Sequence, residues 1–243
     1  MKVVGVIPAR YGSTRFPGKP LALINGKPMI QRVYEQVNKS KELALVVVAT
    51  DNEQIKKTVE GFGGTVIMTR TDHQTGSDRI AEVAEKIEAD FYVNVQGDEP
   101  LIQAELIDAL VQTAKASPEA VVTAKTAIKE EADILNPNVV KVVTGENAQA
   151  LYFSRSALPY NRSGVNHTYY KHLGLYGYPR TVLKRFVQLP ASELEKVEVL
   201  EQLRLIENGY VIKVIETEYD AIGVDTPEDI KKVEKLLGGL QIV

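Results

Sequence analysis

An alternation of short apolar runs with amphipathic stretches constrains the fold of this chain more than any other feature. In the first half, runs that suit buried strands alternate with stretches whose apolar residues recur at helical spacing. We predict strands at 3–7, 45–49, 65–68 and 91–95, and helices at 28–37, 52–62, 78–87 and 104–114. This alternation is typical of βαβ units, whose parallel strands form a sheet that binds ligands at the carboxyl ends of its strands.

The pattern changes after about residue 118, where strand-like runs follow one another without regular helices between them. We predict these strands at 121–128, 139–143, 150–154 and 169–178. Further helices are expected at 181–187, 193–207 and 227–237, with a strand at 210–215. Because the chain has no low-complexity linker and no internal repeat, we predict one α/β domain over residues 1–243. Its sheet is mainly parallel, with an inserted mixed-strand subregion at about 119–180.

The composition excludes several classes of protein. Of the 243 residues, 44% are hydrophobic and 25% charged, and the net charge is −3, so a bulk basic surface for nucleic acid is not expected. The lack of cysteine excludes disulfides, cysteine nucleophiles and thiolate metal sites. The first apolar run ends at Pro8, and no later run reaches about 18 residues, so we expect no membrane partner and a cytoplasmic location.

The segment that follows the first predicted strand is basic. Residues 1–34 contain no Asp or Glu, but they carry Lys2, Arg10, Arg15, Lys19, Lys27 and Arg32. Three of these cations fall in 8–20, a stretch rich in glycine, proline and hydroxyl residues at the carboxyl end of the strand. Glycines let backbone amides approach an anion and the cations neutralise it, so the loop suits a triphosphate. The alternative is a solvated loop whose cations pair with acids elsewhere.

This loop does not match the common phosphate-binding motifs. Gly12 and Gly18 are too far apart for a Walker A sequence, and Pro20 stands where Ser or Thr should follow the lysine. No Gly-x-Gly-x-x-Gly follows a predicted strand either. The kinase, GTPase and dinucleotide-binding interpretations are therefore disfavoured.

Two aspartates stand at element ends where they could hold a metal. Asp98 follows Gly97 directly after the strand at 91–95, and Mg²⁺ favours one or two carboxylates together with phosphates. Asp225 precedes Thr226, which suits a helix N-cap with Pro227 at the first helical position and Asp229 as its partner. The alternatives are that Asp98 is only a turn former and that Asp225 is itself the cap. If both converge on the basic loop, the arrangement is that of phosphoryl or nucleotidyl transfer.

Blocks along nearly the whole chain resemble the 3-deoxy-D-manno-octulosonate (Kdo) cytidylyltransferase family, the CMP-Kdo synthetases. They occur in family order: Ile7-Pro-Ala-Arg-Tyr-Gly-Ser-Thr-Arg-Phe-Pro-Gly-Lys-Pro-Leu21, Ala49-Thr-Asp51, Asn94-Val-Gln-Gly-Asp-Glu-Pro-Leu101, Leu151-Tyr-Phe-Ser-Arg155, Lys171-His-Leu-Gly-Leu-Tyr176, Leu200-Glu-Gln-Leu-Arg204 and Gly223-Val-Asp-Thr-Pro-Glu-Asp229. The sialic-acid-activating relatives typically show Lys-Asn where this chain has Lys19-Pro20.

The resemblance implies a Rossmann-like nucleotide-binding fold of the nucleotide-diphospho-sugar transferase type and a homodimer that uses the subregion at 119–180. It also implies an Mg²⁺-dependent enzyme that converts CTP and Kdo to CMP-Kdo and pyrophosphate for lipopolysaccharide biosynthesis.

The same resemblance implies which residues form the site. Those implied for the nucleotide are Ala9, Arg10, Ser13, Arg15, Lys19, His73, Gly76, Ser77, Arg79 and Asp98. The catalytic set is Asp98, Asp225, Lys19 and Arg10, with Asp98 and Asp225 on the metal. Those implied for the sugar are Gln96, Arg155, His172, Tyr176, Glu201 and Gln202.

One segment departs from the family pattern, which commonly reads His-x-Ser-Gly-Thr. This chain has His73-Gln-Thr-Gly-Ser77, in which both changes keep a hydroxyl. Cytosine selection is therefore expected to persist, and an amino-substituted Kdo or another sugar acid stays open as the acceptor.

Some members of the sugar set also have plain structural interpretations. A lone strand histidine such as His172 is more often structural. The Arg155 side chain could point into solvent instead of binding the sugar carboxylate through bidentate hydrogen bonds. Glu201 and Gln202 fall in an amphipathic stretch, where adjacent polar residues usually form the solvent-exposed face of a helix.

The expected reaction is an in-line attack of the sugar's anomeric hydroxyl on the α-phosphorus of CTP, without a covalent enzyme intermediate. Two rivals come from other classes. A non-catalytic nucleotide sensor would bind CTP without releasing pyrophosphate, and a glycosyltransferase would consume a nucleotide sugar. The long basic loop suits an unshielded triphosphate better than a nucleotide sugar.

Overall fold

The structure is a computed structural model that describes residues 1–12 and 16–239. Its contacts divide the chain into two compact units. The first unit comprises Met1–Asp108 and Ala221–Val243, and the second comprises Ala109–Asp220. The mixed-strand subregion at 119–180 falls inside the second unit, and the single-domain organisation stays a prediction.

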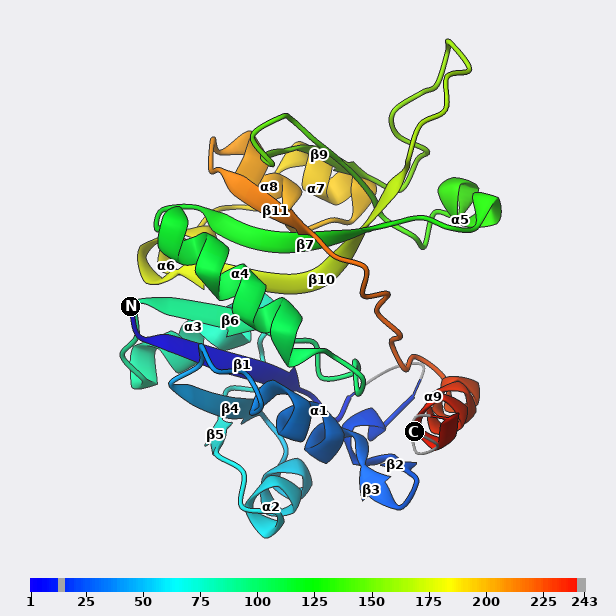
Figure 1. Ribbon diagram of the computed structural model, residues 1–243. Coiled ribbons are helices and arrows are strands. Elements are labelled where there is room, and N and C mark those ends of the chain that lie inside the picture. The colour runs from blue at the N-terminus through cyan, green and yellow to red at the C-terminus, as the bar shows by residue number, and fades with distance from the viewer. Residues whose placement is uncertain (13–15, 240–243) are drawn as a thin grey trace. The chain divides into compact units, whose positions relative to one another are not determined.

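The first unit is built on a parallel sheet with helices packed on it (Figure 1). Strand β1 (Val3–Ala9) pairs in parallel with β4 and with β6, and β4 pairs in parallel with β5. The remaining elements of the sheet and its helices are β4 (Leu45–Thr50), β5 (Val66–Met68), β6 (Phe91–Asn94), α1 (Met29–Val37), α2 (Glu53–Gly61) and α3 (Gly76–Lys86). The predicted α/β fold with a mainly parallel sheet is confirmed.

Helix starts in this unit follow local capping chemistry. The Asn52 side chain accepts hydrogen bonds from the backbone N–H groups of Gln54 and Ile55 at 2.9 and 3.1 Å and begins α2, as predicted. Thr75 and Asp78 form a capping box that begins α3 at Gly76, two residues before the predicted start. The capping box is legible in the sequence as Thr-x-x-Asp, so the late prediction overlooked a signal that was present.

A small hairpin that the sequence interpretation missed follows the basic loop. Strands β2 (Leu23–Ile24) and β3 (Lys27–Pro28) pair antiparallel across Asn25-Gly26, whose φ angles of 45° and 73° are those of a type I′ turn. The short 3-10 helix η1 (Lys19–Leu21) precedes the hairpin, and the C-terminal helix α9 (Pro227–Gly239) lies beside it (Figure 1). Buried Ile24, Met29, Val224 and Val233 make up one core cluster there. Burial of these side chains fixes the start of α9 close to the basic loop.

The second unit carries a mixed sheet, as the change of pattern predicts. Strand β10 pairs antiparallel with β7 and β8, β9 pairs antiparallel with β8, and β11 runs parallel to β7. The strands are β7 (Val121–Ala127), β8 (Lys141–Thr144), β9 (Ala150–Ser154), β10 (Tyr170–Pro179) and β11 (Ile212–Glu216). Short helices α5 (Glu131–Leu135) and α6 (Arg180–Phe186) lie between them along the chain, and α4 (Ala104–Ala116) contains the boundary between the units. The connection at 155–169 extends away from the strands (Figure 1).

The helix predicted at 193–207 is wrong as one element. The structure has two helices, α7 (Glu193–Glu198) and α8 (Leu203–Glu207), separated at Val199, whose φ is 54°. The buried Arg204 side chain donates to Glu195 Oε2 at 2.7 Å and so joins the two short helices. Apolar residues continue at helical spacing through the break, so the sequence pattern did not reveal it.

Within residues 1–12 and 16–239, every helix is too short or too polar to cross a membrane.

Candidate active site

A cavity of about 330 Å³ opens in the first unit where strands β1 and β6 end. Parallel strands deliver their carboxyl ends to the same edge, which is where the sequence predicts a ligand. The lining comes from the basic loop, the loop between β5 and α3, the start of α3, the segment after β6 and the segment before α9. Its members are Pro8, Ala9, Arg10, Lys19, Pro20, His73, Gln74, Thr75, Gly76, Arg79, Gln96, Gly97, Asp98 and Asp225.

A close approach of two backbones holds the segment after β6 against β1. A Cβ added to Gly97 would lie 2.7 Å from the Pro8 carbonyl oxygen, so a side chain there would force the two segments apart. The Val224 N–H donates to the Asp98 carbonyl at 2.9 Å. These two contacts bring Asp98 and Asp225 to one end of the cavity, although 127 positions separate them along the chain.

Lys19 lies between the two aspartates. Its ammonium donates to Asp98 Oδ2 at 2.7 Å and to Asp225 Oδ1 at 3.3 Å, and its side chain is 15% exposed. The predicted convergence of Asp98, Asp225 and the basic loop is therefore present in the geometry. Two carboxylates that face one cation make a strongly charged, partly buried cluster at the cavity wall.

The start of α9 explains why Asp225 is turned toward Lys19. Asp229 Oδ2 accepts from the Thr226 backbone N–H at 3.0 Å and from the Asp225 N–H at 3.2 Å, while Pro227 begins the helix. Thr226 is thus the cap and Asp229 its partner, as the sequence predicts. The Asp225 side chain is left outside the helix, and its carboxylate is the group that contacts Lys19.

Glu99, beside Asp98, is buried at 8% exposure. Burial, followed by the negative charge of Asp98, raises the pKa of Glu99 to about 8. Glu99 is therefore mainly protonated at neutral pH and adds little negative charge to the cluster.

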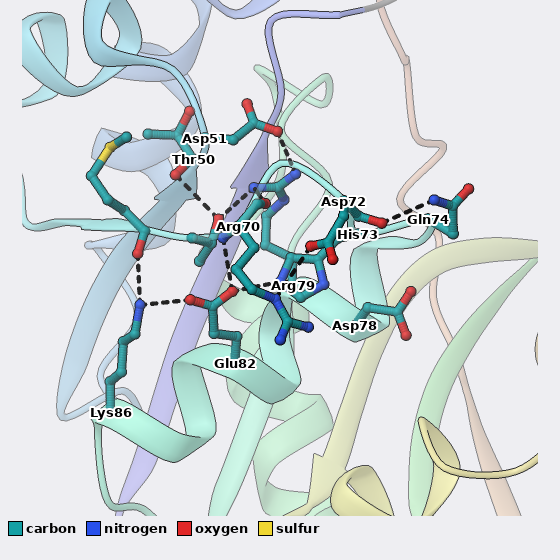
Figure 2. A network of polar contacts seen from close by, with 12 residues as sticks. Thr50, Asp51, Arg70, Asp72, His73, Gln74, Asp78, Arg79, Glu82 and Lys86 are labelled. Carbon is teal, nitrogen blue, oxygen red and sulfur yellow. Dashed lines mark hydrogen bonds and ion pairs between the residues drawn. The ribbon is translucent and has the colours of Figure 1, made fainter.

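A second wall of the cavity comes from the loop between β5 and α3, which carries His73, and from α3 itself, which carries Arg79 (Figure 2). The nucleoside-binding roles of both residues stay predictions. Arg79 donates to Asp51 Oδ2 at 2.7 Å and to the Thr69 hydroxyl, and His73 Nε2 lies 2.5 Å from Glu82 Oε2. Both side chains are only 5% exposed. This wall is thus fixed by ion pairs to residues that do not line the cavity.

Only some of the other residues predicted to bind the nucleotide line the cavity. Ala9, Arg10 and Gly76 line the cavity, whereas Ser77 is 2% exposed and is absent from the lining. Ser13 and Arg15 lie outside the described residues. Thr75, which stands where the family commonly has Ser, uses its hydroxyl to accept from the Asp78 N–H at 3.2 Å. The departure from the family pattern therefore keeps the helix cap.

Of the residues predicted for the sugar, Gln96 lines this cavity and the others belong to the second unit. There His172 lies with its ring 5.2 Å from the ring of Tyr176, and its Nε2 is 3.0 Å from the Thr123 hydroxyl. Burial lowers the pKa of His172 to about 3, so the ring is neutral at pH 7. Burial also raises the pKa of Tyr176, and the charge of Glu201 adds to the shift.

The Arg155 guanidinium is occupied by backbone carbonyls. It donates to the carbonyls of Glu198 at 2.7 Å, Pro137 at 2.9 Å and Val199 at 3.4 Å. Gln202 is 8% exposed at the start of α8, next to Glu201 in the break between α7 and α8. The predicted sugar-binding roles of these residues stay predictions.

Several supporting residues were not identified from the sequence. Thr75 and Gln74 line the cavity, while Asp51, Thr69 and Glu82 hold its wall. Asp51 stands in the block Ala49-Thr-Asp51 at the end of β4, so its place at the carboxyl edge of the sheet was a usable signal. Glu82 lies within a helix and carries no such signal.

Comparisons with known proteins identify the family of the chain. A family model described as cytidylyltransferase matches residues 4–218. A 3-deoxy-manno-octulosonate cytidylyltransferase of Thermodesulfovibrio yellowstonii is 51% identical over 251 residues, covering 98% of each chain. The protein of that name from Geobacter metallireducens is 50% identical over 254 residues, covering 100% of each chain.

Solved structures give the same result. A CMP:2-keto-3-deoxy-manno-octonic acid synthetase complexed with CTP matches with a TM-score of 0.95 and 47% identity, covering 98% of this chain and 99% of that one. A cytidylyltransferase of Leptospira borgpetersenii, 16% identical with a TM-score of 0.64 over 98% of this chain and 87% of its own, shows the shared fold alone. The chain belongs to the cytidylyltransferase family and, within it, to the 3-deoxy-manno-octulosonate cytidylyltransferases.

Proposed function

We propose that this protein transfers the cytidylyl group of CTP to Kdo, giving CMP-Kdo and pyrophosphate. The observation that carries the proposal is the cavity at the carboxyl edge of the parallel sheet, where Lys19, Asp98 and Asp225 meet. The full-length similarity to Kdo cytidylyltransferases supports the choice of nucleotide and sugar. We also propose a role in lipopolysaccharide biosynthesis, as the family resemblance implies.

The reaction is a direct displacement at phosphorus. The anomeric hydroxyl of Kdo attacks the α-phosphorus of CTP, a new P–O bond forms, and the bond to the β-phosphate breaks. The hydroxyl proton is released, and pyrophosphate leaves with the negative charge. Arg10 and Lys19, both at the cavity, would stabilise that charge as it develops.

The carboxylates at the cavity suit a hard divalent cation. Asp98 and Asp225 already converge on one cationic group, Lys19, and both offer oxygen ligands, which Mg²⁺ prefers. Among the described residues, no group of three or more histidine, aspartate or glutamate side chains is placed to hold a metal. A pair of carboxylates matches the way Mg²⁺ is held together with nucleotide phosphates. When bound, Mg²⁺ would supply charge neutralisation and polarise the phosphate.

The acceptor sugar has its own proposed residues. Gln96 in the first unit, with Arg155, His172, Tyr176, Glu201 and Gln202 in the second, would bind the sugar acid. We also propose a homodimer through the subregion at 119–180, as the family resemblance implies. We further propose a cytoplasmic location.

The test is pyrophosphate release with Mg²⁺ and Kdo, with CTP, ATP, GTP and UTP supplied in turn. Release that requires CTP and Kdo together, with CMP-Kdo found by mass spectrometry, supports the proposal. Release with CTP only when an amino-substituted Kdo replaces Kdo would move the acceptor to that analogue. CTP binding without release with any sugar acid would favour a nucleotide sensor, and transfer from a nucleotide sugar would favour a glycosyltransferase.

A further inference from the structure

The carboxylate of Glu82 contacts the loop between β5 and α3, which forms one wall of the cavity. Glu82, on α3, accepts from the Arg70 backbone N–H at 2.9 Å through Oε2, which also lies 2.5 Å from His73 Nε2 (Figure 2). Its other oxygen accepts from Lys86 at 2.6 Å, and Lys86 also donates to the Met68 carbonyl at 2.7 Å. Glu82 therefore ties the loop after β5 to helix α3, and Lys86 joins Glu82 to the end of β5.

Arg79, one helical turn before Glu82 on α3, contacts the same loop. Its guanidinium donates to Asp51 at the end of β4 and to the Thr69 hydroxyl, and that hydroxyl donates to the Thr50 carbonyl at 3.1 Å. Arg79 therefore holds the start of the loop at Thr69 and Arg70, and Glu82 holds it at Arg70 and His73. Contacts of this kind preorganise a loop for a ligand.

Glu82 itself does not line the cavity, whereas His73 does. Any influence of Glu82 on a ligand must therefore pass through His73 or the loop. Its role is consequently one of positioning rather than of contact.

The charge of Glu82 decides which nitrogen of His73 carries a proton. Burial raises the pKa of Glu82, but hydrogen bonds from Lys86, the Arg70 N–H and His73 outweigh it and lower the pKa to about 2. The ionised carboxylate has no proton to donate, so the hydrogen in the contact must sit on His73 Nε2. In the neutral ring, Nδ1 is then a hydrogen-bond acceptor without a proton.

We propose that Glu82 is a positioning residue for base selection: it fixes His73 as the Nε2-protonated tautomer, whose Nδ1 accepts from the amino group of cytosine. Uracil offers a carbonyl oxygen at that position, and two acceptors do not form a hydrogen bond. The network would thus favour CTP over UTP. This inference rests on the proposed use of CTP.

The test compares wild type with Glu82→Gln by two independent measurements at about pH 8.5, where an ordinary histidine is neutral. The first is the ¹⁵N spectrum of histidine-labelled protein, which has only 3 histidines to assign. Wild type should show His73 with its proton on Nε2, and Glu82→Gln should show a mixture of tautomers. The second is equilibrium binding of CTP and UTP, in which the variant should lose about tenfold in CTP affinity and less than twofold in UTP affinity.

Two control variants separate positioning from general damage. Glu85→Gln changes an exposed carboxylate on the same helix and should leave both measurements unchanged. Lys86→Met breaks the bond to Glu82 but keeps the one to His73, so it should lower the melting temperature without altering the CTP-to-UTP ratio. A ratio that falls equally in Lys86→Met and Glu82→Gln would assign Glu82 a structural role only and overturn the inference.

The remaining outcomes are also decisive. An unchanged tautomer, or an unchanged CTP-to-UTP ratio, in Glu82→Gln would contradict the inference while leaving the proposed function standing. A wild-type protein that does not bind CTP would instead contradict the proposed function.

Discussion

The two units hold their predicted site residues in different ways. In the first unit, Lys19, Asp98 and Asp225 come from distant parts of the chain and meet at one cavity. In the second unit, Arg155 is bonded to backbone carbonyls and His172 to the Thr123 hydroxyl. The first arrangement leaves charges where an anionic ligand would lie, and the second uses polar groups to hold the framework together. The comparison predicts that substitutions in the first unit will affect catalysis most, while those in the second will affect stability and sugar use.

The largest effect is expected at Asp225. Asp225→Asn keeps the size of the side chain but removes the charge that faces Lys19. We expect kcat/KM to fall by about 10³-fold, or about 4 kcal/mol, because a metal-binding charge would be lost. Steady-state pyrophosphate release measures it. Glu228→Gln, exposed in the first turn of α9, serves as the control and should retain activity. Comparable loss in both variants would indicate damage to the helix start.

Protonation of Glu82 at low pH should lower the free energy of unfolding of the protein. The pKa of Glu82 is about 2 in the folded protein against 4.5 unperturbed, so its stabilisation is fully present above about pH 4.5 and is lost as the pH falls toward 2. We expect roughly 2–3 kcal/mol, allowing for partial solvent screening. Chemical denaturation at several pH values measures this, and the curve of Glu82→Gln should be flatter in that window. Parallel curves for the two proteins would refute the assignment.

Lys19→Met should lower kcat/KM by about 10²-fold, because one cation at the cavity is removed while the aliphatic stem is kept. The loss should appear in CTP binding as well as in turnover, and titration calorimetry with CTP would reveal it. Lys57→Met, on the exposed side of α2, is the matched control. If Lys19→Met bound CTP as tightly as wild type, Lys19 would not be a triphosphate ligand.

In the second unit, Arg155→Met is expected to act mainly on the fold and on the sugar. Loss of its donors leaves three carbonyls without that partner, which should cost about 1–3 kcal/mol in the free energy of unfolding. We expect KM for Kdo to rise about tenfold and the affinity for CTP to change less than twofold. An equal loss of CTP affinity would remove the distinction between the two units.

The sequence predicted the first unit better than the second for a physical reason. Parallel strands separated by helices send their carboxyl ends to one edge, so Asp98 could be placed there from pattern alone. The Asn25-Gly26 hairpin and the Thr75 cap were legible but overlooked, since their signals are short. The break at Val199 was not legible, because it depends on a backbone angle that no glycine marks. Likewise, the carbonyl partners of Arg155 are tertiary contacts that no spacing encodes.

Metal binding by the Asp98–Asp225 pair can be measured directly with Mn²⁺, a paramagnetic probe, in place of Mg²⁺. Electron paramagnetic resonance would follow Mn²⁺ bound in the presence of CTP, in wild type and in Asp98→Asn and Asp225→Asn. We expect each substitution to weaken Mn²⁺ binding by at least about tenfold while the protein stays folded. If Mn²⁺ bound with CTP as tightly in both variants as in wild type, Asp98 and Asp225 would not form the metal site, and the proposed catalytic cluster would be wrong.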